Sequence, residues 1–156
     1  MTRTRRATVA MLLVGLAIFS SLYSTQAILP TLVRNMGLSS TAAAMTVSAA
    51  TGALALCVVP ASILSERFGR GRILLISAVA ATGVGLIVPL AQEGWQLIVV
   101  RGLQGALLSG PPATAMAWLS EELDDKALPR AMGLYIAGTS VGGLTGRLIP
   151  TGLVEI

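Results

Sequence analysis

Five long apolar blocks constrain the fold of this chain more than any other feature of its sequence. They cover residues 7–29, 42–64, 73–91, 95–119 and 131–153. Each has the roughly 17 to 25 residues with which an α-helix crosses a bilayer, and such a segment must form a helix because its backbone groups find no other partners there. Only 12% of the residues are charged, and the mean hydropathy is +0.79. The sequence therefore predicts an all-α integral membrane protein with five transmembrane helices.

The first block also has the pattern of a secretory signal peptide. Arg3, Arg5 and Arg6 would form its basic region, the run MLLVGLAIF its apolar region and TQA its cleavage site. The apolar run continues past that site to Leu29, and four further blocks follow. We therefore interpret residues 7–29 as a retained transmembrane helix, with cleavage as the alternative.

The positions of the basic residues predict the orientation of the helices, since lysines and arginines of short loops remain on the cytoplasmic side. With the N-terminus inside, Arg34 is the only basic residue of the outer loops. The inner side then contains Arg3, Arg5, Arg6, Arg67, Arg70, Arg72, Lys126 and Arg130. The net charge of +4 thus reflects membrane topology, and we predict no nucleic-acid surface. We expect a protein of the bacterial cytoplasmic (inner) membrane with a cytoplasmic N-terminus.

A charged loop at residues 65–72 joins the second and third blocks, within the sequence SILSERFGRGR. This sequence resembles the loop between helices two and three of the major facilitator superfamily of transporters, whose pattern is Gly, any residue, Leu, small, Asp, Arg, any residue, Gly, Arg, basic, basic. The positions that fit are Leu64, Ser65, Arg67, Gly69, Arg70 and Arg72. The positions that differ are Ser62 for Gly, Glu66 for Asp and Gly71 for a basic residue.

In that family the loop looks like a latch that holds the transporter closed on its cytoplasmic side. The resemblance implies this role for Glu66, Arg67, Gly69, Arg70 and Arg72. A carboxylate at the start of a helix meets the positive end of the helix dipole, and arginines can bridge to carboxylates of neighbouring helices. The alternative is an ordinary positive-inside loop with a helix-capping acid.

Further matches follow in the family's order. In the fourth block Arg101, Gln104 and Gly105 resemble its motif of Arg, Gln and Gly, and LPRAMGLYIAG resembles its entry into helix five. YSTQAILP at residues 23–30 resembles the end of helix one in drug- and sugar-efflux members such as arabinose-efflux-type permeases. The resemblance covers nearly the whole chain, and it implies a partial N-terminal transmembrane domain over residues 1–156 that lacks the sixth helix and the C-terminal half.

The glycines of the fifth block allow two interpretations. Gly133, Gly142 and Gly146 reproduce the first part of the glycine pattern of drug/proton antiporters in this superfamily, but Arg147 stands where that pattern has proline. Gly138, Gly142 and Gly146 recur every four residues and so line one helix face, where a neighbouring helix can approach closely. We interpret these three as helix-packing residues.

Two arginines, Arg101 and Arg147, lie inside predicted spans. Each is six residues from the outer end of its block, about 9 Å deep at about 1.5 Å per residue. An ionisable group there costs of order 2 to 4 kcal/mol unless it is solvated or paired. Because a guanidinium suits carboxylate or phosphate, we assign both arginines to a substrate cavity and expect an anionic substrate or partner helix. The alternative is that each side chain extends to the headgroups as an anchor.

Neutral polar residues complete the predicted cavity: Tyr23, Gln26, Gln104, Tyr135 and Thr139. The alternative for each is a bond to its own helix or a place at the membrane interface. Pro111 and Pro112 fall in the middle of the fourth block and predict a kink there, because proline removes helix hydrogen bonds.

The sequence has no histidine and one cysteine, and we predict no metal site, no cofactor and no enzyme activity. No acidic residue lies well inside a block, so a group for proton coupling would lie outside these residues. We expect an ion-coupled transporter of small solutes in a lipid bilayer, with efflux slightly preferred. Its partner would be the missing C-terminal half or another membrane chain. The alternative is a transport-incompetent fragment, or a small membrane subunit that acts by helix association.

Overall fold

The computed structural model describes residues 3–154, and this part of the chain contains helices and no strand. The elements are α1 (Arg3–Ala27), α2 (Leu29–Met36), α3 (Ser40–Phe68), α4 (Arg70–Ile87), the 3₁₀ turn η1 (Val88–Leu90), α5 (Gly94–Leu108), α6 (Gly110–Glu122) and α7 (Leu128–Val154). The all-α class predicted from the sequence is confirmed.

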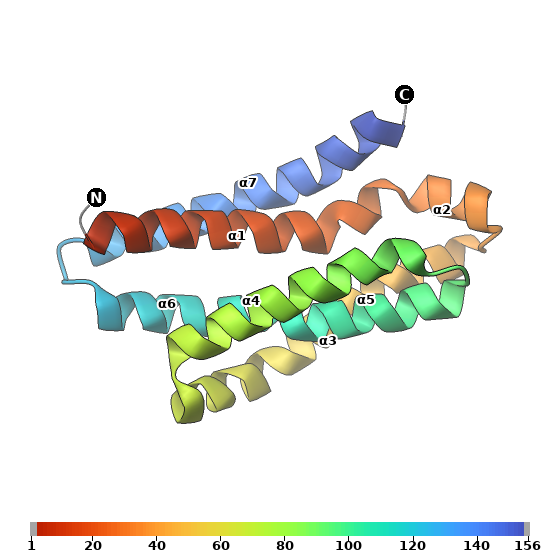
Figure 1. The fold of residues 1–156 in the computed structure, drawn as a ribbon. Helices are drawn as coiled ribbons and strands as arrows, with labels where there is room; N and C mark the ends of the chain where they lie inside the picture. The colour runs from red at the N-terminus through yellow and green to blue at the C-terminus, as the bar shows by residue number, and fades with distance from the viewer. Residues whose placement is uncertain (1–2, 155–156) are drawn as a thin grey trace.

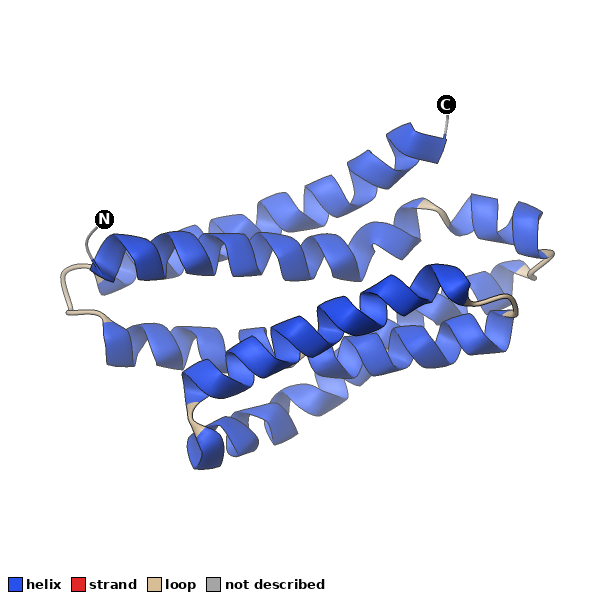
Figure 2. Ribbon diagram, in the orientation of Figure 1, coloured by secondary structure: helices blue, strands red, loops and turns tan. Residues whose placement is uncertain are grey.

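The helices form two layers, with α1 and α7 side by side in one layer and α3 to α6 in the other (Figure 1). Long helices are joined by short loops (Figure 2). The start of α1, the turn between α3 and α4 and the connection from α6 to α7 lie at one end of the bundle, whereas α2 and the connection from α4 to α5 lie at the other (Figure 1). The basic residues predicted to be cytoplasmic therefore all belong to one end.

Short polar signals set the helix boundaries. Ser39 caps α3, because its side-chain oxygen accepts a hydrogen bond from the Ala42 backbone N–H at 3.1 Å. Glu93 and Gln96 form a capping box at the start of α5. Gly37 ends α2 in the left-handed conformation, with φ of 62°, which glycine adopts without steric cost.

The predicted loop at residues 65–72 is wrong, because both flanking helices continue into it. Helix α3 runs to Phe68 and α4 begins at Arg70, so Gly69 alone makes the turn, with φ of 94°. Only glycine readily adopts this backbone conformation. Glu66 consequently lies in the last turn of α3, where it cannot cap the start of a helix, and the interpretation of Glu66 as a capping acid is wrong.

The fourth apolar block forms two helices. Helix α5 ends at Leu108 and α6 begins at Gly110, with Pro111 and Pro112 in the first turn of α6. Proline is tolerated there because the first N–H groups of a helix have no partner within the helix. The two prolines were expected to kink one helix, and in the structure they follow a one-residue interruption at Ser109, which keeps right-handed helical backbone angles (φ −69°, ψ −26°).

Three helical segments are long and apolar enough to cross a membrane: α1, α3 and the segment Arg70–Leu90 formed by α4 and η1. Side chains on these segments remain highly exposed, with 79% exposure for Leu56 and 75% for Leu86, as expected for surfaces that face lipid or further helices. Helices α5 and α6 are individually short, and α7, which contains Arg147, is not among the three segments. The count of five spans stays a prediction.

Helices α1 and α7 pack closely because α7 presents glycines to the backbone of α1. Gly138, Gly142 and Gly146 lie against the carbonyl groups of Leu12, Leu16 and Ser20 respectively. A Cβ atom at any of these glycines would overlap α1, so only glycine permits this approach. The Ser20 hydroxyl also donates a hydrogen bond to the Gly142 carbonyl at 3.0 Å.

Candidate functional site

Arg101 of α5 is buried in the bundle with only 1% of its surface exposed. Its Nη1 donates to the Ser21 carbonyl at 3.2 Å and to Gln104 Oε1 at 2.5 Å, and its Nη2 donates to the Leu22 carbonyl at 2.6 Å. The Gln104 amide in turn donates to the Ser21 hydroxyl at 3.0 Å. A buried charge is tolerated only when hydrogen bonds replace its water, and here carbonyls of α1 and one amide oxygen do so.

These bonds join three helices. Besides its contact with Ser21 of α1, the Gln104 Nε2 lies 3.5 Å from the Ala81 carbonyl of α4. The Arg101 Nε is buried and has no acceptor among the described residues. A cavity of about 500 Å³ adjoins the cluster, and its walls include Ser21, Arg101, Gln104 and Pro150. Arg101 thus holds α5 against α1 at the edge of a cavity.

Arg147 of α7 has different surroundings. Its Nε donates to Gln26 Oε1 at 3.1 Å, and its guanidinium carbon lies 4.5 Å from the centre of the Tyr23 ring. The Arg147 side chain is exposed, and its Nη1 and Nη2 have no partner among the described residues. Tyr23 and Gln26 therefore contact the guanidinium, and its two amino groups have no hydrogen-bond partner among the described residues.

The two arginines do not lie in one cavity of the described chain. The cavity beside Arg101 reaches Pro150 of α7 but is not lined by Arg147. Both arginines contact the last turns of α1, Arg101 through Ser21 and Leu22 and Arg147 through Tyr23 and Gln26. The donors of Arg101 are largely occupied by the protein, and those of Arg147 are not.

Two other predicted cavity residues lie apart from both clusters. Tyr135 is 5% exposed and packs in an apolar cluster with Met11 and Leu119. The Thr139 hydroxyl donates to the Ile136 carbonyl of its own helix at 2.7 Å, the ordinary arrangement for threonine in a helix. Among the described residues, no hydrogen bond joins either side chain to an arginine.

At the opposite end of the bundle, one residue of the predicted latch, Arg70, meets the end of α6. Arg70 Nη1 lies 3.0 Å from Glu121 Oε1 and donates to the Ala117 carbonyl at 3.2 Å. Arg3 at the start of α1 pairs with Glu122 at 2.6 Å. Glu66, Arg67 and Arg72 are exposed and form no ion pair within residues 3–154.

The sequence interpretation assigned no role to Glu121 and Glu122. The available signal was two consecutive carboxylates at the inner end of the fourth block, the same end as the arginine-rich turn. No group of three or more metal-binding side chains occurs among the residues described.

The sequence model of the Major Facilitator Superfamily matches residues 11–156. The chain belongs to this superfamily. Relatives include the inner membrane transport protein YnfM of Escherichia coli, 35% identical over 92% of this chain and 34% of its own length. The MFS-type transporter YybF of Bacillus subtilis is 36% identical over 93% of the chain and 36% of its own length. A probable 4-methylmuconolactone transporter of Cupriavidus pinatubonensis is 33% identical over 58% of the chain and 21% of its own length.

Membership in the Major Facilitator Superfamily agrees with the three long apolar helices and makes this an integral membrane protein. It points to a transporter rather than an enzyme. The chain spans about a third of the length of the first two relatives. No solved structure matches it.

Proposed function

We propose that these residues form the first five membrane spans of a secondary transporter of small solutes. The observation that carries this proposal is the match of the superfamily's sequence model to residues 11–156. The names of the relatives from E. coli and C. pinatubonensis, a transport protein and a probable transporter of a small organic compound, support it. A C-terminal half or another membrane chain would supply the second set of helices that alternating access requires.

The proposed orientation places the N-terminus in the cytoplasm of a bacterial cell, with the protein in the cytoplasmic membrane. It is supported by the common location of the basic helix ends at one end of the bundle (Figure 1) and by the rule that such residues stay inside. The name of the E. coli relative supports an inner membrane location. Labelling of single cysteines placed on either side, in a Cys57→Ser background, tests the orientation.

We further propose that the substrate is anionic and contacts Arg147, with Tyr23 and Gln26 beside it. The support is geometric: Gln26 and the Tyr23 ring fix the guanidinium, and its two amino groups face no acceptor of the described chain. The two amino groups of a planar guanidinium can donate parallel hydrogen bonds to two oxygens of a carboxylate or phosphate. Arg101 and Gln104 would hold the cavity wall.

Efflux is the proposed direction, on the resemblance of residues 23–30 to the first helix of efflux members. Ion coupling is proposed with it, and its titratable group would come from outside these residues. The ion pair between Arg70 and Glu121 would take part in closing the cytoplasmic side, as the resemblance implies for the predicted latch.

A second function is favoured by the exposed apolar surface of α3. Its most apolar window is only 6% buried, and Leu56 and Val59 are exposed. A small membrane subunit that associates with other helices would cover this surface. Such a subunit would copurify with a second polypeptide and would not transport by itself.

One experiment separates the two functions. The N-terminus is tagged at the native locus, and the mass of the membrane-embedded product is measured. A product of about 40 kDa, the size expected for roughly a dozen spans with their loops, supports the transporter. A product near 16.0 kDa that binds a second polypeptide supports the subunit.

A further inference from the structure

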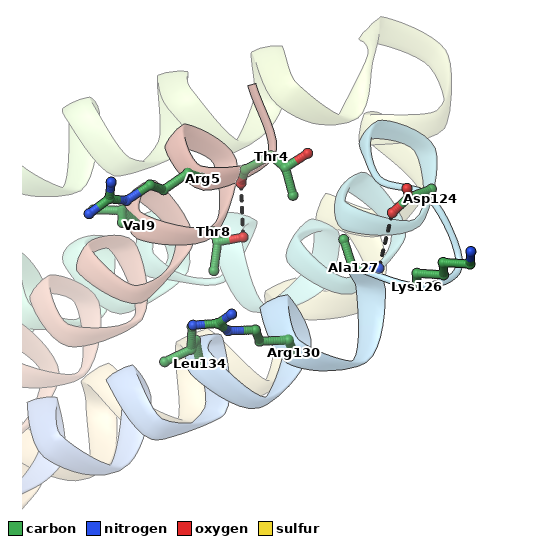
Figure 3. A pocket seen from close by; sticks show the side chains of 9 residues that line it. All are labelled: Thr4, Arg5, Thr8, Val9, Asp124, Lys126, Ala127, Arg130 and Leu134. Atoms are coloured by element: carbon green, nitrogen blue, oxygen red, sulfur yellow. Dashed lines mark hydrogen bonds between the residues drawn. The ribbon is translucent and has the colours of Figure 1, made fainter. Parts of the chain in front are cut away.

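A cavity of about 680 Å³ opens between the first turns of α1, the first turns of α7 and the connection that precedes α7 (Figure 3). We call it the α1–α7 groove. Its lining residues are Thr4, Arg5, Thr8, Val9, Asp124, Lys126, Ala127, Arg130 and Leu134. It lies at the end of the bundle opposite the Arg101 and Arg147 clusters, and the proposed transport function does not use it.

The groove carries an excess of positive charge. Arg5, Lys126 and Arg130 line it together with one acid, Asp124. The Asp124 carboxylate accepts a hydrogen bond from the Ala127 N–H at 3.0 Å and so is used at the start of α7 (Figure 3). Lys126 and Arg130 are exposed, and no carboxylate of residues 3–154 lies within ion-pair distance of them. Both cations therefore lack an acidic partner among these residues, and they point in different directions, Arg130 along α7 toward Leu134 and Lys126 away from it (Figure 3).

Both walls change from basic to apolar in the same direction. Val9 follows Arg5 by four residues on α1, and Leu134 follows Arg130 by four residues on α7. Residues four apart share a helix face, about 6 Å apart along the axis. All four line the groove, and Figure 3 shows the two helices facing each other across it. In the proposed orientation the basic end lies at the cytoplasmic surface and the apolar end lies deeper in the bilayer.

This order of groups matches one class of ligand. A phospholipid of the cytoplasmic leaflet places its phosphate at the surface and its acyl chains below, and anionic phospholipids add negative charge to that surface. The Thr8 hydroxyl, which donates to the Thr4 carbonyl at 2.9 Å, still has lone pairs for a headgroup hydroxyl. We propose that the α1–α7 groove binds an anionic phospholipid, with the phosphate at Arg130, the charge of Lys126 attracting the headgroup from the rim of the groove, and an acyl chain along Val9 and Leu134.

The placement in the cytoplasmic leaflet rests on the proposed orientation, whereas the binding itself does not. A soluble phosphate offers the same oxygens without the acyl chain, so the apolar wall distinguishes the two sources. Binding is therefore measured directly, without transport, by native mass spectrometry of the chain released from detergent micelles that contain phosphatidylglycerol or phosphatidylcholine.

We expect phosphatidylglycerol to be retained in preference to phosphatidylcholine. Arg130→Gln and Lys126→Gln should each weaken retention about five-fold, the effect of one basic residue near an anionic surface. Two controls make the same charge change outside the groove: Arg72→Gln at the same end of the bundle and Arg34→Gln in α2 at the other. Both should stay within about two-fold of the unmodified chain, and size-exclusion profiles should show that all variants remain folded.

Three results would overturn the proposal. Equal retention of phosphatidylglycerol and phosphatidylcholine would show that the negative charge of the lipid does not contribute to binding. A loss in Arg72→Gln as large as in Arg130→Gln would mean general surface attraction. Displacement of the lipid by millimolar inorganic phosphate would make the ligand a soluble anion. An inverted orientation in cysteine labelling, with the retention pattern unchanged, would contradict only the proposed topology and leave the binding intact.

Discussion

Arg147 of α7 stacks on the ring of Tyr23 of α1, with 4.5 Å between the guanidinium carbon and the ring centre. The same guanidinium forms no ion pair with a carboxylate of the described chain. The positive charge of Arg147 is instead stabilised by the electron-rich face of the Tyr23 ring and by a hydrogen bond to the Gln26 amide oxygen. Arg101, by contrast, has three bonds to protein oxygens. This contrast makes Arg147 the residue to test for ligand binding and Arg101 the residue to test for stability.

Replacing Arg147 by Gln should remove ligand-dependent stabilisation. In the purified protein, small carboxylates and phosphates that raise the thermal midpoint should lose this effect in Arg147→Gln and keep part of it in Arg147→Lys, which retains the charge but not the fork. Thermal shifts across an anion panel provide the measurement. Tyr23→Phe is the matched control, because it keeps the ring. An unchanged shift in Arg147→Gln would place the anion site elsewhere.

Replacing Arg101 by Leu should destabilise the bundle strongly. The carbonyls of Ser21 and Leu22 and the Gln104 amide would lose a charged donor, and bonds to charged groups contribute about 1.5 to 3 kcal/mol each. Thermal unfolding in detergent, followed by circular dichroism, measures the loss. Gln104→Leu should cost less, and the double variant should cost less than the sum of the two, because the two side chains contact each other. Additive losses would contradict the coupling.

The α1–α7 contact predicts opposite effects for two Gly→Ala changes in one helix. At Gly142 the new methyl group would overlap the Leu16 backbone, and such overpacking costs about 1 to 3 kcal/mol. At Gly133 nothing lies within 4 Å of the added Cβ, so the higher helix propensity of alanine should stabilise by up to about 1 kcal/mol. Thermal midpoints should fall for Gly142→Ala and rise for Gly133→Ala. Equal shifts would mean that the close packing is absent.

The Arg70–Glu121 pair should affect conformation more than stability. Both side chains are partly exposed, and exposed ion pairs contribute about 0 to 1 kcal/mol. Glu121→Gln should therefore change the thermal midpoint little, but it should increase labelling of a cysteine placed at Ala117 in a Cys57→Ser background. The charge-swapped variant Arg70→Glu/Glu121→Arg should restore the original labelling. Labelling that is the same in all three proteins would argue against a latch.

Much of the fold was predictable because it depends on composition and spacing. The length of the apolar blocks predicted helices, and the glycines four residues apart predicted a flat face on one of them. The position of the interruption at Ser109 was less predictable: Pro111 and Pro112 indicated a kink, but the residue at which the helix hydrogen bonding is interrupted depends on how the neighbouring turns are packed. The loop at residues 65–72 was wrong for a related reason, since Glu66 and Arg67 are also good helix formers and one glycine was enough for the turn.

The candidate site was likewise predictable in part. The sequence by itself determined the superfamily, through the motifs at residues 62–72 and 101–105, and it singled out Arg101 and Arg147 because a charge in an apolar block is costly. Only the tertiary structure decided that Arg101 is bonded to α1 while Arg147 rests on Tyr23, that Tyr135 is a core residue, and that Glu121 faces Arg70. The physical reason is that burial cost depends on a residue and its neighbours along the chain, whereas hydrogen-bond and ion-pair partners come from helices that pack together over long sequence distances.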